Sequence, residues 1–220
     1  MVPEKTKLLC FSPKNRHLDA YYWKTISHVS VNGHKIDFTD EAEHVGILRS
    51  TKTGNMASIL ARQSAHTRAV HSVLPAGLAR GHHGNPAAAL RVEQMYGVPV
   101  LLSGLGSLVL SKTEMCCLDH HFKVGLEQLQ RLYKSTPAPV VYFLAGSLPA
   151  SALLHLRQLS LLTMISRLGP SNILHKHGVN ALSCPAGYPK SWFLQVRQIC
   201  LQPSCHPRDF FVKKVLSFGT

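Results

Sequence analysis

The sequence predicts an α+β fold, with a short N-terminal antiparallel β region followed by a mostly helical, basic body. Two observations support this class: short apolar runs between turn signals fill the first fifty residues, and from Asn55 onward the apolar positions recur with helical spacing. The hydrophobic content of 45% and the length of 220 residues are typical of a chain that buries a core.

The β region is expected to hold four short strands. The run KLLCF at 7–11 is the first, and SHVSV at 27–31 and HKIDF at 34–38 flank Asn32-Gly33, a dipeptide typical of two-residue hairpins. HVGIL at 44–48 is expected to be the fourth strand.

The first predicted helix runs from Asn55 to about Leu74 and ends at Pro75. The core face is expected to hold Met56, Ile59, Leu60, Val70 and Leu74. A second helix is predicted over 86–96, with Asn85 as its N-cap and its end near Gly97.

A capping box, Ser111 to Glu114, opens a helix that is predicted to reach Tyr133. Its core face is expected to comprise Met115, Leu118, Phe122, Leu126, Leu129 and Tyr133. The apolar run 136–156 is interrupted by prolines, so a buried strand, a turn and a core helix are expected there rather than a membrane span. The segment 150–168 is predicted to be a helix buried all round, and 191–201 a last helix capped by Ser191.

The formal net charge is +13, and two long spans, 44–92 and 128–208, contain no acidic residue. Such an excess is typical of proteins that bind nucleic acid or another polyanion, and it is also compatible with a basic surface that only keeps the protein soluble. The six cysteines show no framework spacing, and no secretory signal is expected because MVPEKTKLLCF at 1–11 lacks an apolar h-region. Reduced thiols and a nuclear or cytoplasmic location are therefore expected.

Motifs for catalysis are weak. Cys116, Cys117, His120 and His121 form two i,i+4 pairs on the predicted helix, but zinc needs four tetrahedral ligands and one helix face offers about two. These side chains are expected on the non-core side of that helix. The acidic cluster at 37–43 is interpreted as a solvated turn rather than a divalent-ion site, and no metal site is predicted.

The segments EKTKLLCF at 4–11 and EHVGILRS at 43–50, with the basic helices after them, resemble the end of the palm of a reverse transcriptase from a non-LTR (LINE-like) retrotransposon. The resemblance implies that Lys5 and Thr6 open a strand late in the palm. It also implies that His44, Val45 and Gly46 match the primer grip. A helical thumb and a connector would follow.

The same resemblance implies three parts: a palm fringe at 1–52, a thumb-like helical region at 53–135 and a connector-like region at 136–220. Polymerisation requires metal-holding aspartates, and the sequence contains no Asp-Asp pair. No catalytic residue and no cofactor are therefore expected, since Mg²⁺ would need the missing palm carboxylates.

We accordingly expect a remnant polymerase that binds primer–template nucleic acid, such as an RNA–DNA hybrid, without sequence preference. No association with a membrane is expected. The expected contacts are Arg49, Lys52, Arg62, Arg68 and Arg80. Self-association through exposed apolar surface is a further expectation. The alternative function is a non-catalytic helical protein-interaction module with incidental basic charge.

Overall fold

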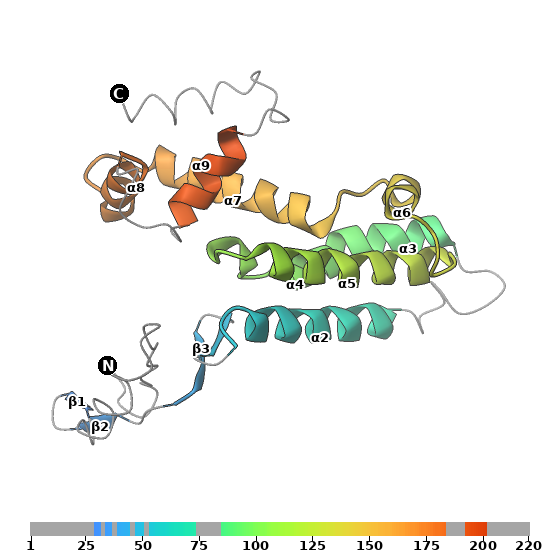
Figure 1. Ribbon diagram of the computed structural model, residues 1–220, viewed down its shortest axis with the longest axis horizontal. Coiled ribbons are helices and arrows are strands. Elements are labelled where there is room, and N and C mark those ends of the chain that lie inside the picture. Colours follow the sequence, from blue (N-terminus) through green and yellow to red (C-terminus); the bar gives the residue numbers. More distant parts are fainter. Residues whose placement is uncertain are drawn as a thin grey trace. The chain divides into compact units, whose positions relative to one another are not determined.

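The computed structural model describes residues 29–31, 34–36, 39–44, 47–50, 53–73, 85–183 and 192–201. The chain divides into two compact units, Met1–Arg62 and Gln63–Thr220, which are described separately below as the N-terminal unit and the helical unit. Figure 1 shows the elements in sequence order, from the blue strands to the red helix α9.

The N-terminal unit contains two antiparallel hairpins. Strand β1 (Val29–Val31) pairs with β2 (His34–Ile36), and the register Val31↔His34 leaves the two-residue connection predicted at 32–33. The second hairpin pairs β3 (Glu41–His44) with β4 (Ile47–Ser50), with His44 opposite Ile47. The single strand expected over 44–48 is therefore wrong, because the chain reverses direction there and two antiparallel strands meet. Part of the predicted acidic turn is strand β3, whose glutamates are exposed.

Helix α2 (Met56–Val73) begins in the N-terminal unit and continues into the helical unit. Ser58 donates a hydrogen bond to the carbonyl of Leu48, which joins the start of the helix to strand β4. The helix was predicted, but its core face was partly wrong: Ile59 is fully buried, whereas Leu60 is 54% exposed. Leu74 and the first predicted strand, at 7–11, lie outside the described residues.

The second predicted helix extends beyond Gly97. Helix α3 (Pro86–Val92) passes into a π-helical turn, η3 (Glu93–Gly97), and then into α4 (Val98–Leu101). As predicted, the Asn85 side chain caps α3 by accepting a hydrogen bond from the Ala87 N–H at 2.9 Å, and Pro86 occupies the first turn.

Helix α5 (Lys112–Gln130) is central to the helical unit and packs against α3, α6 and α7. The predicted capping box is confirmed, since both of its reciprocal bonds between Ser111 and Glu114 form. Four predicted core residues are buried: Leu118, Phe122, Leu126 and Leu129. The prediction for Tyr133 is wrong, because α5 ends at Gln130 with Arg131 in the left-handed region, and Tyr133 is 85% exposed.

The segment 136–156, which was expected to open with a strand, instead forms a helix, a short connection and the start of a second helix. Helix α6 (Ala138–Ala145) ends at Gly146, whose φ of 58° favours glycine, and α7 (Ala150–Arg167) follows. Asp119 of α5 accepts a hydrogen bond from the Ser151 N–H at 2.7 Å and so caps α7 from another helix. Helix α7 is not buried all round as predicted, since Leu156 and Met164 are more than half exposed.

Helix α8 (Ile173–Ser183) was not predicted, whereas α9 (Trp192–Leu201) was; its proposed cap, Ser191, lies outside the described residues. Both helices pack on α7, and α9 contributes Val196 and Cys200 to a cluster around Leu162. Three side chains bind carbonyls near the turn η4 (Leu105–Ser107): Trp192 binds Gly106 at 2.8 Å, Gln158 binds Leu108 and Gln195 binds Leu110. These bonds provide donors for backbone carbonyls that lie outside a regular α-helix or β-sheet.

Within the described residues, no single helix is both long enough and apolar enough to cross a bilayer. Helices α6 and α7 reach that length and hydropathy only when taken together, and the chain bends by 58° between them. The predicted α+β class, with short antiparallel strands before a mostly helical body, is confirmed.

The capping box predicts a measurable contribution to stability. Replacing Ser111 by Ala removes the acceptor for the Glu114 N–H, so the free energy of unfolding should fall by about 1 kcal/mol. Urea unfolding followed by circular dichroism measures this change. Ser111→Asp is the matched control, because aspartate is an equally good N-cap and should leave the stability within about 0.5 kcal/mol of the wild type. An equal loss in both variants would contradict the role of the cap.

Candidate functional site

The predicted nucleic-acid contacts fall into three groups. Arg49 is exposed on strand β4, and Lys52 and Arg80 lie outside the described residues. Arg62 and Arg68 both belong to α2, the first half-buried and the second exposed. Six residues apart on one helix, they point about 120° away from each other around its axis. They therefore do not form a single compact basic patch.

Among the residues assigned by resemblance, only His44 lies in the described part of the chain, exposed at the end of β3. Lys5, Thr6, Val45 and Gly46 lie outside it.

The acidic residues of the helical unit are all engaged in internal contacts wherever the structure describes them. Glu93 is buried against His66, and the buried Glu127 pairs with Lys123 at 3.0 Å. Glu114 accepts from the Ser111 N–H at 2.7 Å, and Asp119 caps α7. These four carboxylates therefore add little negative charge to the surface of the unit.

Basic residues, in contrast, lie at the surface of the helical unit on many elements. The sequence of this unit contains fifteen lysines and arginines but only five acidic residues. Of the five acids, Asp209 alone lies outside the described residues. The exposed cations are Arg68, Arg91, Lys112, Arg131, Lys134, Arg167 and Lys176. Over the described residues of the unit, the exposed charged side chains are therefore all positive.

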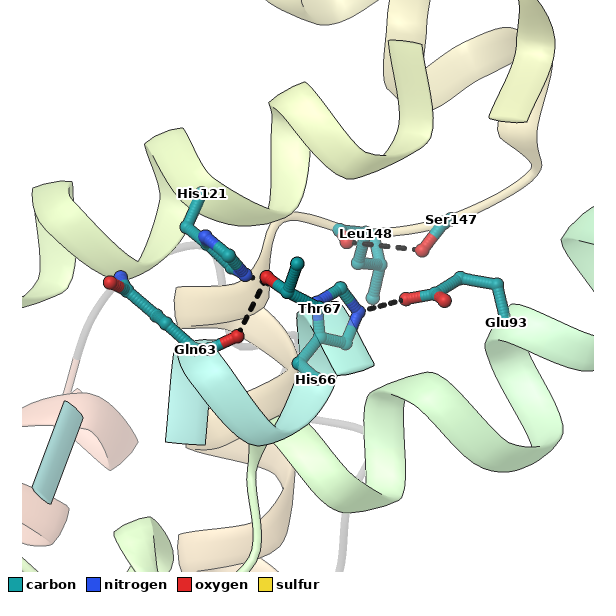
Figure 2. A network of polar contacts seen from close by, with 7 residues as sticks. All are labelled: Gln63, His66, Thr67, Glu93, His121, Ser147 and Leu148. Carbon is teal, nitrogen blue, oxygen red and sulfur yellow. Dashed lines mark hydrogen bonds and ion pairs between the residues drawn. The ribbon is translucent and has the colours of Figure 1, made fainter. Parts of the chain in front are cut away.

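A second candidate site is a buried polar network that joins α2, η3 and α5. His66 of α2 lies between two partners, Glu93 and His121 (Figure 2). Its Nε2 is 2.6 Å from Glu93 Oε1 and its Nδ1 is 3.1 Å from His121 Nε2. His66 and Glu93 are 2% and 3% exposed, and the two imidazole rings meet edge to face with centroids 5.2 Å apart. We refer to Glu93, His66 and His121 as the histidine network.

Glu93 reaches His66 because of the local shape of η3. In a π-helix the hydrogen bonds skip one extra residue, which widens the turn, and such turns recur at functional sites. The Glu93 carboxylate folds back over Gly97, where an added Cβ would lie 2.1 Å from Glu93 Oε2. Glycine is therefore required at position 97 for the carboxylate to occupy this position.

The hydrogen-bonding roles follow from the partners. A carboxylate accepts hydrogen bonds, so His66 Nε2 carries a proton, and the shared contact between His66 Nδ1 and His121 Nε2 holds one more. Burial, followed by the charges of His66 and His120, lowers the pKa of His121 to about 4, although Glu93 acts in the opposite direction. His121 is therefore neutral at pH 7.

Cys117 lies one helical turn before His121. Its sulfur and its carbonyl both receive the Gln63 amide, at 3.5 and 3.2 Å, and an amide donor does not remove the thiol proton as a catalytic base would. The prediction that both i,i+4 pairs lie on the non-core side of α5 is half wrong. Cys117 and His121 are half-buried toward α2, whereas Cys116 and His120 are exposed. In the part of the chain that the structure describes, no three ligating side chains are placed to hold a metal ion.

The histidine network was missed at the level of sequence, although α2 carried a signal for it. Its buried face runs through Ile59, Gln63, His66 and Ala69, so two polar residues occupy the centre of the core-facing stripe. A buried polar side chain requires a partner, which predicts a glutamate or histidine on a neighbouring helix.

A scan against models of protein families finds no match, and searches of curated proteins and of solved structures find none either.

Gly97→Ala tests the geometry around Glu93. The new methyl group must displace the carboxylate, which leaves His66 without its partner, so the free energy of unfolding should fall by about 1–3 kcal/mol. Urea unfolding measures the loss.

The control is the same substitution in a Glu93→Ala background, where no carboxylate opposes the methyl group. Alanine is a better helix former than glycine, so Gly97→Ala should there stabilise by about 0.5–1 kcal/mol. Equal effects in the two backgrounds would show that Glu93 does not pack over Gly97.

Proposed function

We propose that the chain is a non-catalytic remnant of a retrotransposon reverse transcriptase whose helical unit binds the backbone of nucleic acid, RNA–DNA hybrid included, without reading its sequence. The observation that carries this proposal is the internal engagement of Glu93, Glu114, Asp119 and Glu127. Because Glu93 and Glu127 are buried, and Glu114 and Asp119 are half-buried and bound to backbone N–H groups, phosphate meets the exposed arginines and lysines with little opposition.

The distribution of the cations supports backbone contact rather than base recognition. They lie on α2, α3, α5, α7 and α8 and in the α5–α6 connection, and no single helix gathers the set that reads base edges in a groove. Contacts of this kind position a duplex and depend strongly on salt, because each neutralised phosphate releases counterions. The resemblance of 4–11 and 43–50 to the palm end of a reverse transcriptase agrees with a hybrid as the ligand.

Arg68→Gln tests the proposal in a mobility assay with a labelled RNA–DNA hybrid at several salt concentrations. The wild type should bind at low salt and lose affinity steeply as salt rises, and loss of one phosphate contact should reduce the slope of log affinity against log salt by about 1. Arg68→Lys should retain the slope.

Leu60→Gln is the matched control, because Leu60 is exposed on the same helix and the change leaves the net charge unaltered. Absence of binding by the wild type at low salt would overturn the proposal. A slope that is the same in Arg68→Gln and Leu60→Gln would remove Arg68 from the contacts.

A second function, self-association, is favoured by the outer face of α6. Val141 and Ala145 of this helix are buried, and Tyr142 stacks on Phe122 of α5. The opposite face exposes Val140, Phe143 and Leu144 by 43%, 84% and 54%. We call these three residues the α6 outer face.

The occupant that best fits the α6 outer face is a second copy of the chain. Helix α6 carries no charged side chain, so two copies can approach through it with less repulsion than through surfaces that bear the net charge of +13. Such a contact places the same patch on both partners, as a two-fold dimer requires.

Phe143→Ser should raise the dimer dissociation constant by about tenfold or more, because a largely exposed phenyl group loses its apolar burial in the dimer. Sedimentation velocity over a concentration series measures this change. Met164→Ser on α7 is the control, since Met164 is also exposed and lies outside the α6 outer face. A wild type that stays monomeric, or equal effects of both substitutions, would refute this assignment.

A further inference from the structure

Over the side chains of 63–72 that the structure describes, helix α2 has little apolar surface to hold it in the helical unit. Its fully buried side chains there are His66 and Ala69, and those half-buried are Gln63, Ala65 and Val70. The burial of two alanines and one valine contributes only a few kcal/mol. The polar contacts of Gln63 and His66 therefore carry an unusually large share of the attachment.

The contact between His66 and His121 tolerates only one proton between its two nitrogens. With the proton of neutral His66 on Nε2 toward Glu93, its Nδ1 accepts, so the neutral pair forms one hydrogen bond that His121 Nε2 donates to His66 Nδ1 across 3.1 Å. One added proton leaves this bond intact, because it is accommodated as an imidazole–imidazolium pair. A second added proton places N–H groups on both facing nitrogens, and no acceptor remains between them.

We propose that the His66–His121 contact is an acid-sensitive latch, which holds residues 63–73 of α2 against η3 and α5 and releases them when both imidazoles are protonated. The inference is independent of the proposed nucleic-acid binding, since it concerns only how α2 is attached.

In the part of the chain that the structure describes, Glu93 and His120 are the other charged groups that act on His121. The thiol of Cys117 lies one helical turn before it and accepts from Gln63. Glu93 on η3 is bound to His66 and also favours positive charge on His121, but burial and the neighbouring imidazole outweigh this effect. His120 on α5 itself adds repulsion toward His121. Two imidazolium ions 3.1 Å apart at a buried site repel strongly because little water screens them.

The direction of the pH effect follows from linkage. The pKa of His121 is lowered to about 4 in the folded protein from 6.5 for the free side chain. Below pH 6.5, His121 therefore binds a proton in the released state but not in the latched state. The contribution of the latch is complete above pH 6.5 and declines as the pH falls toward 4.

Hydrogen exchange measured by mass spectrometry tests the latch on the full chain. Peptides from α2 are compared with peptides from α7 in the same sample, so that the intrinsic pH dependence of exchange cancels. Between pH 6.5 and 4 the opening of α2 relative to α7 should rise by about 10- to 100-fold.

His121→Gln should abolish this rise, because an amide N–H still donates to His66 Nδ1 and takes up no proton. His120→Gln is the matched control on the exposed neighbour and should retain most of the rise. If His121→Gln does not fold, the imidazole C–H resonances of the wild type replace it: one histidine should titrate in step with the opening of α2. The latch is overturned if α2 and α7 lose protection together, or if His121→Gln and the wild type open alike.

Discussion

The helical unit depends on the placement of the Glu93 carboxylate in its interior. Moving a carboxylate from water into the interior costs several kcal/mol unless it accepts a hydrogen bond there. The donor to Glu93 is His66 Nε2, at 2.6 Å. This pairing holds His66 of α2 beside η3. The other nitrogen of His66 binds His121 and so holds α5 beside α2. The absent Cβ at Gly97 and the π-helical turn of η3 make the position sterically accessible. One buried charge thus sets the register of three helices.

The same requirement shapes the surface. The carboxylate of Asp119 caps α7, that of Glu114 caps its own helix, and that of Glu127 pairs with Lys123. A sequence with few acids that assigns them to internal contacts leaves an excess of positive charge at the surface that the structure describes. The basic surface is therefore partly a consequence of how the interior is built, and the total charge does not by itself predict it.

Local signals in the sequence predicted the parts of the fold that local chemistry decides. Asn32-Gly33 marked the first hairpin, Asn85 capped α3 and the capping box opened α5, since each acts within about four residues. The β-branched and aromatic run from Val140 to Phe143 favoured a strand, but packing of Val141 and Tyr142 on α5 decided for a helix. The histidine network joins residues 27 and 55 positions apart, so only the folded chain brings them together. The displacement of Leu60 from the core follows from it, because Gln63 and His66 occupy the buried stripe of α2.

Charge and apolar surface support different functions in this protein, and salt separates them. The exposed cations support the proposed polyanion binding but leave the α6 outer face unexplained, whereas that face supports the proposed self-association without involving the cations. Salt competes with phosphate contacts and weakens the first interaction. It also screens the repulsion between two chains of charge +13, which strengthens the second. Binding that persists at high salt therefore belongs to the α6 outer face, and binding confined to low salt belongs to the basic surface of the helical unit.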